Sequence, residues 1–343
     1  MKSPSNLLIL ILSVITTSIC YGFPEYIREG YGSCSACHVQ PNGGGPLKPY
    51  GRTISGENLS TFGTEEKGGV FYGLPDLSPL FDVAGDFRYL DFHHRDETVD
   101  IRQKFVMQKE ISLVFTPASN VTFVASGGYY GFEPKDAEYR RYFGIVNLGR
   151  LWLRVGRFLP AFGYNIPDHT KGIKELFGQG KETLNSEIGY QGKAFEIIAT
   201  RVVAGDALFK TGTKPTVRQQ EAKDGATLTL GLHPFQRLHL GVSSAWLEDA
   251  SKVQRYVSYT VSTGLARIYA LGEYQSYPKS GDYRAYGEVG FIPFKGFHIK
   301  AEYDANPLTQ KWYGTVQWFP YPHFELSFSK SENASIFVSH YYL

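Results

Sequence analysis

Short segments in which apolar and polar residues alternate recur along the chain from about residue 80 to its last residue. Clear examples are FHIKAEY (297–303), KWYGTVQWF (311–319) and HFELSFS (323–329). Because successive side chains of a strand point to opposite faces, each segment predicts a strand with one apolar and one polar face. About sixteen such segments (roughly 14–18) follow one another, the first near Leu80 and the last ending at Leu343.

Two kinds of connection separate these segments. Four short turns each place a proline just ahead of the next segment, at TPASNVTF (116–123), HPFQRLHL (233–240), IPFKGFHI (292–299) and FPYPHFEL (319–326). Longer polar loops alternate with the short turns, at 93–100, 129–139, 157–184, 204–224, 247–253, 275–282, 304–310 and 329–335. Short connections on one rim and long ones on the other, between an even number of strands, are typical of outer-membrane barrels. The pattern predicts an all-β transmembrane antiparallel barrel over residues 79–343.

The end of the chain and the placement of aromatic residues agree with a barrel. The chain stops inside an alternating segment, IFVSHYYL (336–343), as expected for a last strand that closes the sheet. Aromatic residues gather near predicted strand ends, where interfacial girdles lie; they are Trp246, Trp312, Trp318, Tyr259, Tyr274 and Tyr303. A soluble sandwich with one polar face would show the same alternation, but the difference between the rims and the export signal described next favour the barrel.

The first 22 residues read as a secretory signal peptide. Lys2 gives a positive start, an apolar core runs from Leu7 to Ile15, and small and polar residues follow up to a predicted cleavage after Gly22. Cys20 suggests a lipoprotein as the alternative, but Ile19 stands where a small residue is required. Export places the mature chain, and its cysteines, in an oxidising compartment.

Composition narrows the classes further. The 343-residue chain has a formal net charge of +2, which gives no case for a nucleic-acid partner. Beyond the signal, no stretch is apolar over the roughly 18 residues that a membrane helix needs. Aromatic residues make up 15% of the chain and glycine is abundant.

One motif carries chemistry, the sequence SCSACH at residues 33–38. Zinc would want about four ligands, and no second cysteine pair is near; a thioredoxin-type disulfide would open a helix in a βαβ unit, which is missing. C-x-x-C-H in an exported chain matches the attachment of a c-type haem, because two thiols add to the vinyl groups and the histidine ligates iron. We therefore predict one covalent haem c, with Cys34 and Cys37 as thioethers and His38 as the proximal ligand.

The segment that carries the motif, residues 23–78, is small. About fifty residues cannot bury a haem in a core of their own, whereas the lumen of a barrel of about sixteen strands can accept a plug. Gly43 to Gly45, Pro46 and Pro49 predict compact turns that bring backbone close to the ring. We predict a plug that enters from the periplasmic side; a flexible tether is the alternative.

The second axial ligand is left open by the sequence. Residues 39–78 contain neither His nor Met, so a protein ligand would come from the barrel or from the new N-terminus. The barrel candidates are Met107, His169, His239, His298 and His340. Met107 shares the parity of the lipid-facing residues unless a bulge reverses it, and His169 lies in the long loop 157–184. A five-coordinate or water-ligated iron is the alternative.

Strand parity also predicts how charge is distributed over the lumen. Basic residues from early strands face inward, namely Arg88, Arg102, Lys104, Arg140 and Arg154. Acidic residues face inward from late strands, namely Glu273, Glu288, Glu302 and Glu325. The basic wall is a hypothetical partner for the haem propionates, and plain solvation of the lumen is the alternative.

With its C-x-x-C-H, the following LKPYGR (47–52) and a porin-like barrel, the chain resembles the fused monohaem cytochrome–porins of the outer membrane. RVGRFLPAFGYNIP (154–167) also resembles the strand and loop entry of general and phosphate-type porins. The resemblance implies a bacterial outer-membrane electron conduit between an extracellular donor or acceptor, such as Fe(II), and a periplasmic c-type cytochrome or other carrier. It adds Arg52 to the cofactor-binding residues and places the short turns and both termini in the periplasm.

Two other functions stay open at this point. The chain would be a diffusion porin if the haem peptide only plugs or gates the pore. It would be a haem-based sensor or oxidase of a small molecule if the iron proves five-coordinate.

Overall fold

The computed structural model of this chain describes residues 24–31, 34–63, 78, 80–131, 137–164, 171, 173, 182–203, 224–249, 252–278 and 281–342. The predicted signal peptide, its cleavage after Gly22, Cys20 and His169 lie outside the described residues. Within them, the helices are short, and none has the length and apolar character that would let it cross a membrane.

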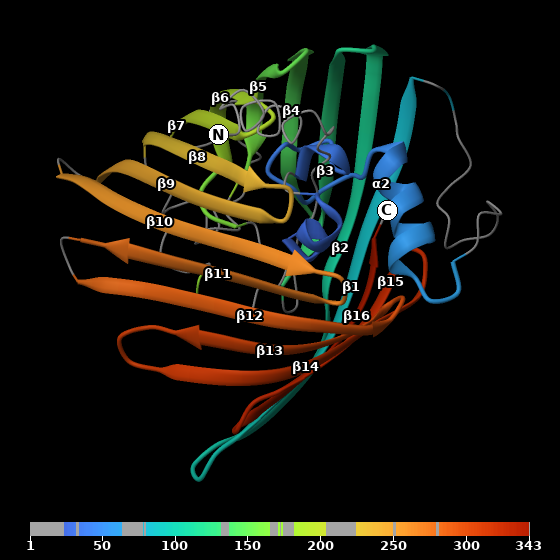
Figure 1. The fold of residues 1–343 in the computed structure, drawn as a ribbon, viewed down its shortest axis with the longest axis vertical. Helices are drawn as coiled ribbons and strands as arrows, with labels where there is room; N and C mark the ends of the chain where they lie inside the picture. The colour runs from blue at the N-terminus through green and yellow to red at the C-terminus, as the bar shows by residue number, and fades with distance from the viewer. Residues whose placement is uncertain are drawn as a thin grey trace, which may run out of the picture.

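Sixteen antiparallel strands form a closed barrel, as the alternation predicts (Figure 1). In chain order they are β1 (Phe81–Arg95), β2 (Asp100–Ala118), β3 (Val121–Tyr130), β4 (Glu138–Leu148), β5 (Leu151–Phe158), β6 (Thr183–Gln191), β7 (Phe195–Val203), β8 (Gly225–Phe235), β9 (Leu238–Asp249), β10 (Lys252–Leu265), β11 (Ile268–Tyr277), β12 (Asp282–Phe294), β13 (Phe297–Ala305), β14 (Gln310–Tyr321), β15 (Phe324–Lys330) and β16 (Ala334–Tyr342). Each strand pairs with its neighbours in sequence, and β16 closes the ring against β1.

The proline turns have a common structure. In each of the four hairpins the ladder register shifts just before the turn. The proline lies in that unpaired stretch, where its missing N–H removes no ladder hydrogen bond; the four are Pro117, Pro234, Pro293 and Pro320. The predicted tight turns are therefore confirmed, and they lie on the rim where β1 begins and β16 ends, called here the turn rim.

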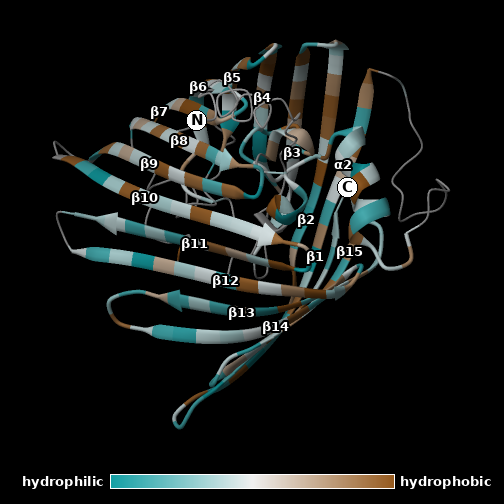
Figure 2. Cartoon of the chain, viewed as in Figure 1, coloured by the Kyte–Doolittle hydropathy of each residue, from teal (hydrophilic) through white to brown (hydrophobic). Residues whose placement is uncertain are grey.

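Hydrophobic and hydrophilic residues alternate along the strands (Figure 2). On β2 and β5, Leu113 and Val155 are 57% and 61% exposed on the outer face. Their neighbours Ser112 and Arg154 are buried on the inner face. An apolar outer surface and a polar interior suit a barrel that spans a lipid membrane.

A bulge in β2 reverses the predicted direction of two charged residues. The register between β1 and β2 shifts so that Arg88 pairs with Gln108, but Tyr89 pairs with Val106. Met107 is the extra residue, and beyond it Arg102 and Lys104 share the face of Asp91 and bond to it at 3.0 and 3.3 Å. The prediction that Arg102 and Lys104 face the lumen is wrong, because one inserted residue inverts strand parity.

A second bulge lies between β3 and β4, at the level of Arg140. Here Arg141 pairs with Ser126 on the inner face, while Gly127 pairs with Tyr139. Arg141 bonds Glu110 at 2.9 Å, and Arg140 bonds Glu182 at 2.7 Å. Both arginines therefore reach carboxylates, although parity had selected Arg140 alone.

The N-terminal segment contacts the turn rim of the barrel (Figure 1). It consists of the 3-10 helices η1 (Pro24–Glu29) and η2 (Cys34–Ala36), helix α2 (Pro49–Ile54) and the wider π-helical turn η3 (Ser55–Leu59). Side chains or amides of this segment bond to four hairpin ends; these bonds are Ser35 Oγ to Gln191 Oε1 at 2.6 Å, Arg28 to Ala266 O at 3.1 Å, Thr61 Oγ1 to Lys295 O at 3.0 Å and Thr61 N to Phe319 O at 2.8 Å.

Other contacts reach deeper into the lumen. Asn42 Nδ2 donates to Leu159 O at 2.8 Å, and Val39 packs against the apolar cluster around Phe143, Trp152 and Phe158. A second apolar contact joins Tyr26, Ile54 and Leu59 to Phe319. The described part of the segment therefore folds against the barrel interior, and we call residues 24–63 the plug.

The loop after β5 also turns inward. Gly163 N donates to Ser243 Oγ at 3.1 Å, and Tyr164 N donates to Glu273 Oε2 at 2.9 Å. Further along, the fully buried Lys171 lies 3.3 Å from Glu302. Plug and loop therefore share the lumen.

We predict that Arg154→Met lowers the free energy of unfolding by about 3–5 kcal/mol, because it leaves the carboxylate of Glu187 buried without its cation. The two side chains are both 0% exposed and 2.8 Å apart, and Arg154 also bonds Asn42 of the plug. Urea titration of the folded barrel in detergent measures the change.

The matched control is Arg102→Met, since Arg102 is 59% exposed in its pair with Asp91. A surface pair contributes at most about 1 kcal/mol. Equal effects of the two substitutions would contradict the importance of the buried pair.

Candidate functional site

The cysteine motif folds as one tight turn. The amides of Cys37 and His38 both donate to Cys34 O, at 3.2 and 3.0 Å. Neither thiol forms a disulfide. A turn of this kind keeps the two sulfurs on one short piece of backbone, as attachment to one ring requires.

His38 is held by a closed loop. It bridges to Leu47 across an antiparallel pair, and Val39 N donates to Pro46 O at 3.1 Å. Burial lowers the pKa of His38 to about 4, partly offset by the backbone of Gly45 and reinforced by the charge of Lys48. The imidazole is therefore neutral at pH 7, the form in which a ring nitrogen binds a metal.

Glycines make room beside the first thiol. Gly43, Gly44 and Gly45 have φ values of 82°, 73° and 65°, a region that other residues adopt only with strain. A Cβ on Gly43 would lie 3.1 Å from Cys34 Sγ. The predicted compact turn is confirmed, and its approach to a haem ring stays a prediction.

Cys34 lies near the beginning of β7, where Glu196 is located. Burial raises the pKa of its thiol to about 12, with further contributions from the negative charge of Glu196 and from Cys37. Ser35 bonds Gln191, which pairs with Glu196 across β6 and β7. Lys48 Nζ donates to Ser35 O at 2.6 Å and braces the turn from the plug side.

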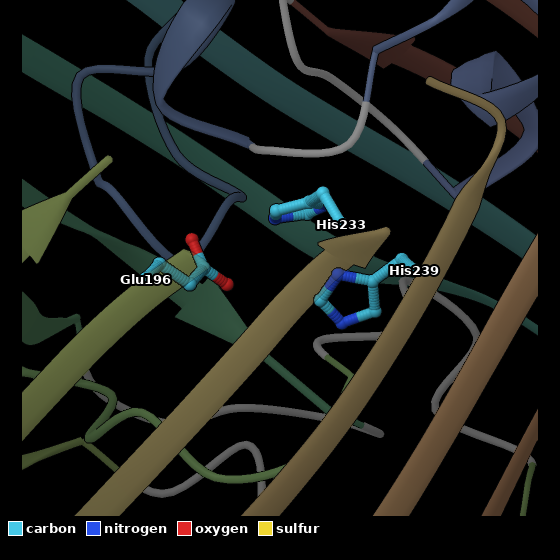
Figure 3. Close-up of side chains that lie close together, drawn as sticks. All are labelled: Glu196, His233 and His239. Atoms are coloured by element: carbon cyan, nitrogen blue, oxygen red, sulfur yellow. The ribbon is translucent and has the colours of Figure 1, made fainter. Parts of the chain in front are cut away.

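Two histidines and a carboxylate converge beside this turn (Figure 3). Glu196 comes from β7, His233 from β8 and His239 from β9, and one ligand atom of each lies within 4.8 Å of the other two. Of the predicted axial candidates, His239 is thus in the neighbourhood of Cys34. His233 and Glu196 were not predicted, although both share the inward parity of buried Thr227 and Thr200 on their strands.

The other axial candidates have different surroundings. His340 lies 3.1 Å from Asp86 and 3.3 Å from Glu325 through its two ring nitrogens. His298 is 2% exposed and packs on Phe319, which contacts Ile54 and Leu59 of the plug. Met107 lies at the β2 bulge, near the middle of that strand. Of these candidates, His239 is the one that clusters with Glu196, whose charge acts on Cys34.

The basic residues predicted to bind the cofactor or its propionates already face carboxylates. Arg52 pairs with Asp82 at the start of β1, Arg154 with Glu187, and Arg88 lies between Asp86 and His340. On the acidic side, Glu273, Glu288, Glu302 and Glu325 all face the lumen, as predicted, with hydroxyl, amide or lysine partners; these are Ser258, Tyr269, Lys300, Thr315 and Gln317. The lumen is thus a network of opposite charges, and the early-strand wall is less basic than parity suggested.

The residues present fit a c-type haem by their chemistry. Two thiols outside any disulfide on one turn, a neutral buried histidine next to them and a glycine loop against the first sulfur are what covalent attachment and proximal ligation need. Cys34 and Cys37 would hold the ring, and His38 would bind its iron.

Comparison with known proteins supports the barrel. No protein-family model and no curated protein matches the chain. Among solved structures, it is similar to a loop L8 deletion mutant of the outer membrane protein OmpT of Vibrio cholerae, with a TM-score of 0.55 and 10% identity over 77% of this chain and 99% of that one.

Two further structures show the same likeness. The outer membrane channel DcaP of Acinetobacter baumannii has a TM-score of 0.54 and 11% identity over 79% of this chain and 99% of that one. OmpF of Salmonella typhi, solved with daunomycin, has a TM-score of 0.58 and 8% identity over 77% and 97%. At this identity the likeness shows the fold alone: the chain is a porin-like sixteen-stranded barrel.

Proposed function

We propose that this chain is an outer-membrane cytochrome–porin that carries electrons through one covalently bound haem c. The observation that carries the proposal is the place of the C-x-x-C-H turn, which lies in a plug packed against the interior of a closed barrel. The motif and the barrel are explained together by this function, because a plain channel has no need of the motif and a soluble cytochrome has no need of the barrel.

The proposed location follows from the outer face and the rims. Exposed apolar side chains on β2 and β5 suit contact with outer-membrane lipid. Short turns lie on one rim, together with the beginning of β1 and the end of β16. Since periplasmic turns are short in this class, we assign the turn rim, with both termini and the plug, to the periplasm.

A haem held there would supply one-electron chemistry through its iron. The chain's own residues do the rest: Cys34 and Cys37 fix the group at the turn rim, and His38, neutral by burial, ligates the iron. The plug position suits exchange with a periplasmic c-type cytochrome or other carrier. On the other side, an extracellular donor or acceptor, such as Fe(II), completes the proposed path.

The comparisons favour a second candidate, a diffusion porin in which the haem peptide is a plug or gate. One of the similar structures is described as an outer membrane channel. In this case the lumen would pass solutes when the plug moves. Liposomes that contain the protein separate the two functions. A conduit reduces an enclosed electron acceptor without leakage of sugars, whereas a porin leaks sugars without reduction.

Covalent haem is the first prediction of this proposal. The full exported chain, purified from an outer membrane, is expected to stain for haem on a denaturing gel and to give a pyridine haemochrome spectrum. Cys37→Ala removes one thioether and is expected to lower the haem content strongly. Ser35→Ala, between the two cysteines, keeps both thiols and is the control. Wild-type protein free of haem would end the proposal.

The glycine loop gives a finer prediction. Gly43→Ala places a methyl group 3.1 Å from Cys34 Sγ at a φ of 82°. Gly30→Ala has a similar φ of 89° but meets nothing within 4 Å. Both variants carry about 1–2 kcal/mol of backbone strain, so a lower haem yield in Gly43→Ala than in Gly30→Ala reports crowding at the thiol. Equal yields would show that this approach is not needed for attachment.

A further inference from the structure

Three neighbouring strands bring metal-binding side chains to one point at the turn rim (Figure 3). Glu196 and His239 are the second residues of β7 and β9, and His233 lies two residues before the end of β8. One ligand atom from each lies within 4.8 Å of the other two. The three positions are 37 and 6 residues apart in sequence, so the convergence is made by strand pairing and not by local structure.

The backbone leaves space between these side chains. Gly231 pairs with Glu196 on one side and with Gly241 on the other. A Cβ on Gly231 would lie 2.7 Å from Glu196 Cγ and 3.0 Å from His239 Cε1. The side chains of Glu196 and His239 thus both occupy the space that a side chain at Gly231 would fill.

Two of these groups are unsatisfied among the residues that the structure describes. His239 is 7% exposed, and its Nδ1 has no hydrogen-bond partner there. Glu196 is half-buried, and its carboxylate has neither a hydrogen bond nor an ion pair with a described residue. Leaving a buried imidazole nitrogen unpaired costs free energy, and a cation bound between His239 and Glu196 would recover it.

We infer that Glu196, His233 and His239 bind a divalent first-row transition-metal ion such as Zn²⁺. Two imidazoles and one carboxylate are the ligand set of open zinc sites and of mononuclear iron sites. Three protein ligands leave a coordination position open toward the lumen. The ion would stand beside Cys34 and would tie β7, β8 and β9 together under the plug.

The number of donors distinguishes this site from haem ligation. A haem iron that already carries His38 accepts one further ligand. A carboxylate and two imidazoles around one point are more donors than a haem iron can accept, and they suit a separate metal ion. The inference goes beyond the proposed function and does not require it.

Zinc binding to the full mature chain in detergent tests the inference. The protein is stripped with a chelator and equilibrated with Zn²⁺, and bound zinc is measured by equilibrium dialysis with elemental analysis. We expect equimolar zinc, with imidazole and oxygen ligands in X-ray absorption at the zinc edge. His239→Ala and Glu196→Gln are expected to weaken binding by more than about 100-fold, since loss of outer-shell partners alone costs about 10–100-fold.

The matched control is His298→Ala, because His298 is also a buried histidine at the second position of its strand and lies outside the cluster. It is expected to bind zinc as wild type does, and heat-modified migration on gels verifies that each variant is folded. Absence of equimolar zinc from wild type, or wild-type binding by His239→Ala, would overturn the inference. A change of haem spin state in His239→Ala, in a protein whose wild type binds no zinc, would show that His239 ligates the haem iron and would also overturn the inference. Haem content is measured separately, so failure of the proposed function is seen independently.

Discussion

Closure of β16 onto β1 is the constraint on which the other features depend. In lipid, every backbone N–H and C=O needs an internal partner, and a ring of strands without a free edge provides it. Once the ring is closed, strand alternation divides the side chains into an apolar outer set and a polar inner set. The inner set must then find partners inside a confined space, and the plug and the loop after β5 supply many of them.

The lumen meets this need by pairing charges rather than by separating them. Arg154 bonds Glu187 and Asn42 of the plug, and Arg141 bonds Glu110 while lying against Gly45 of the plug. Because a buried charge without a partner is costly, each such bond fixes both the wall and the segment that leans on it. Glu196 differs from the lumen carboxylates named above, because its carboxylate has neither a cation nor a hydrogen-bond donor among the described residues, and this led us to infer a bound ion there.

The sequence was sufficient for the barrel, because alternation and turn chemistry are local signals: the strand number, the closing strand and the four proline turns follow from short windows. Bulges are different. One extra residue at Met107 inverts the parity of Arg102 and Lys104, and nothing in the local pattern shows it. The metal-binding cluster was missed for a related reason, since Glu196 and His233 meet only through the β7–β8 register. The C-x-x-C-H motif was visible at once because its chemistry lies within five consecutive residues.

The position of the plug also bears on the order of events during biogenesis. The plug precedes β1 in the chain and packs inside the rim where the first and last strands join. Its Cys34 thiol, once packed there, is partly covered, and its pKa is raised to about 12, which favours the protonated form, the unreactive one. For a chain that carries the proposed haem, attachment to this turn would therefore have to come while the turn is still accessible, before the strands assemble around it and the barrel inserts into the membrane.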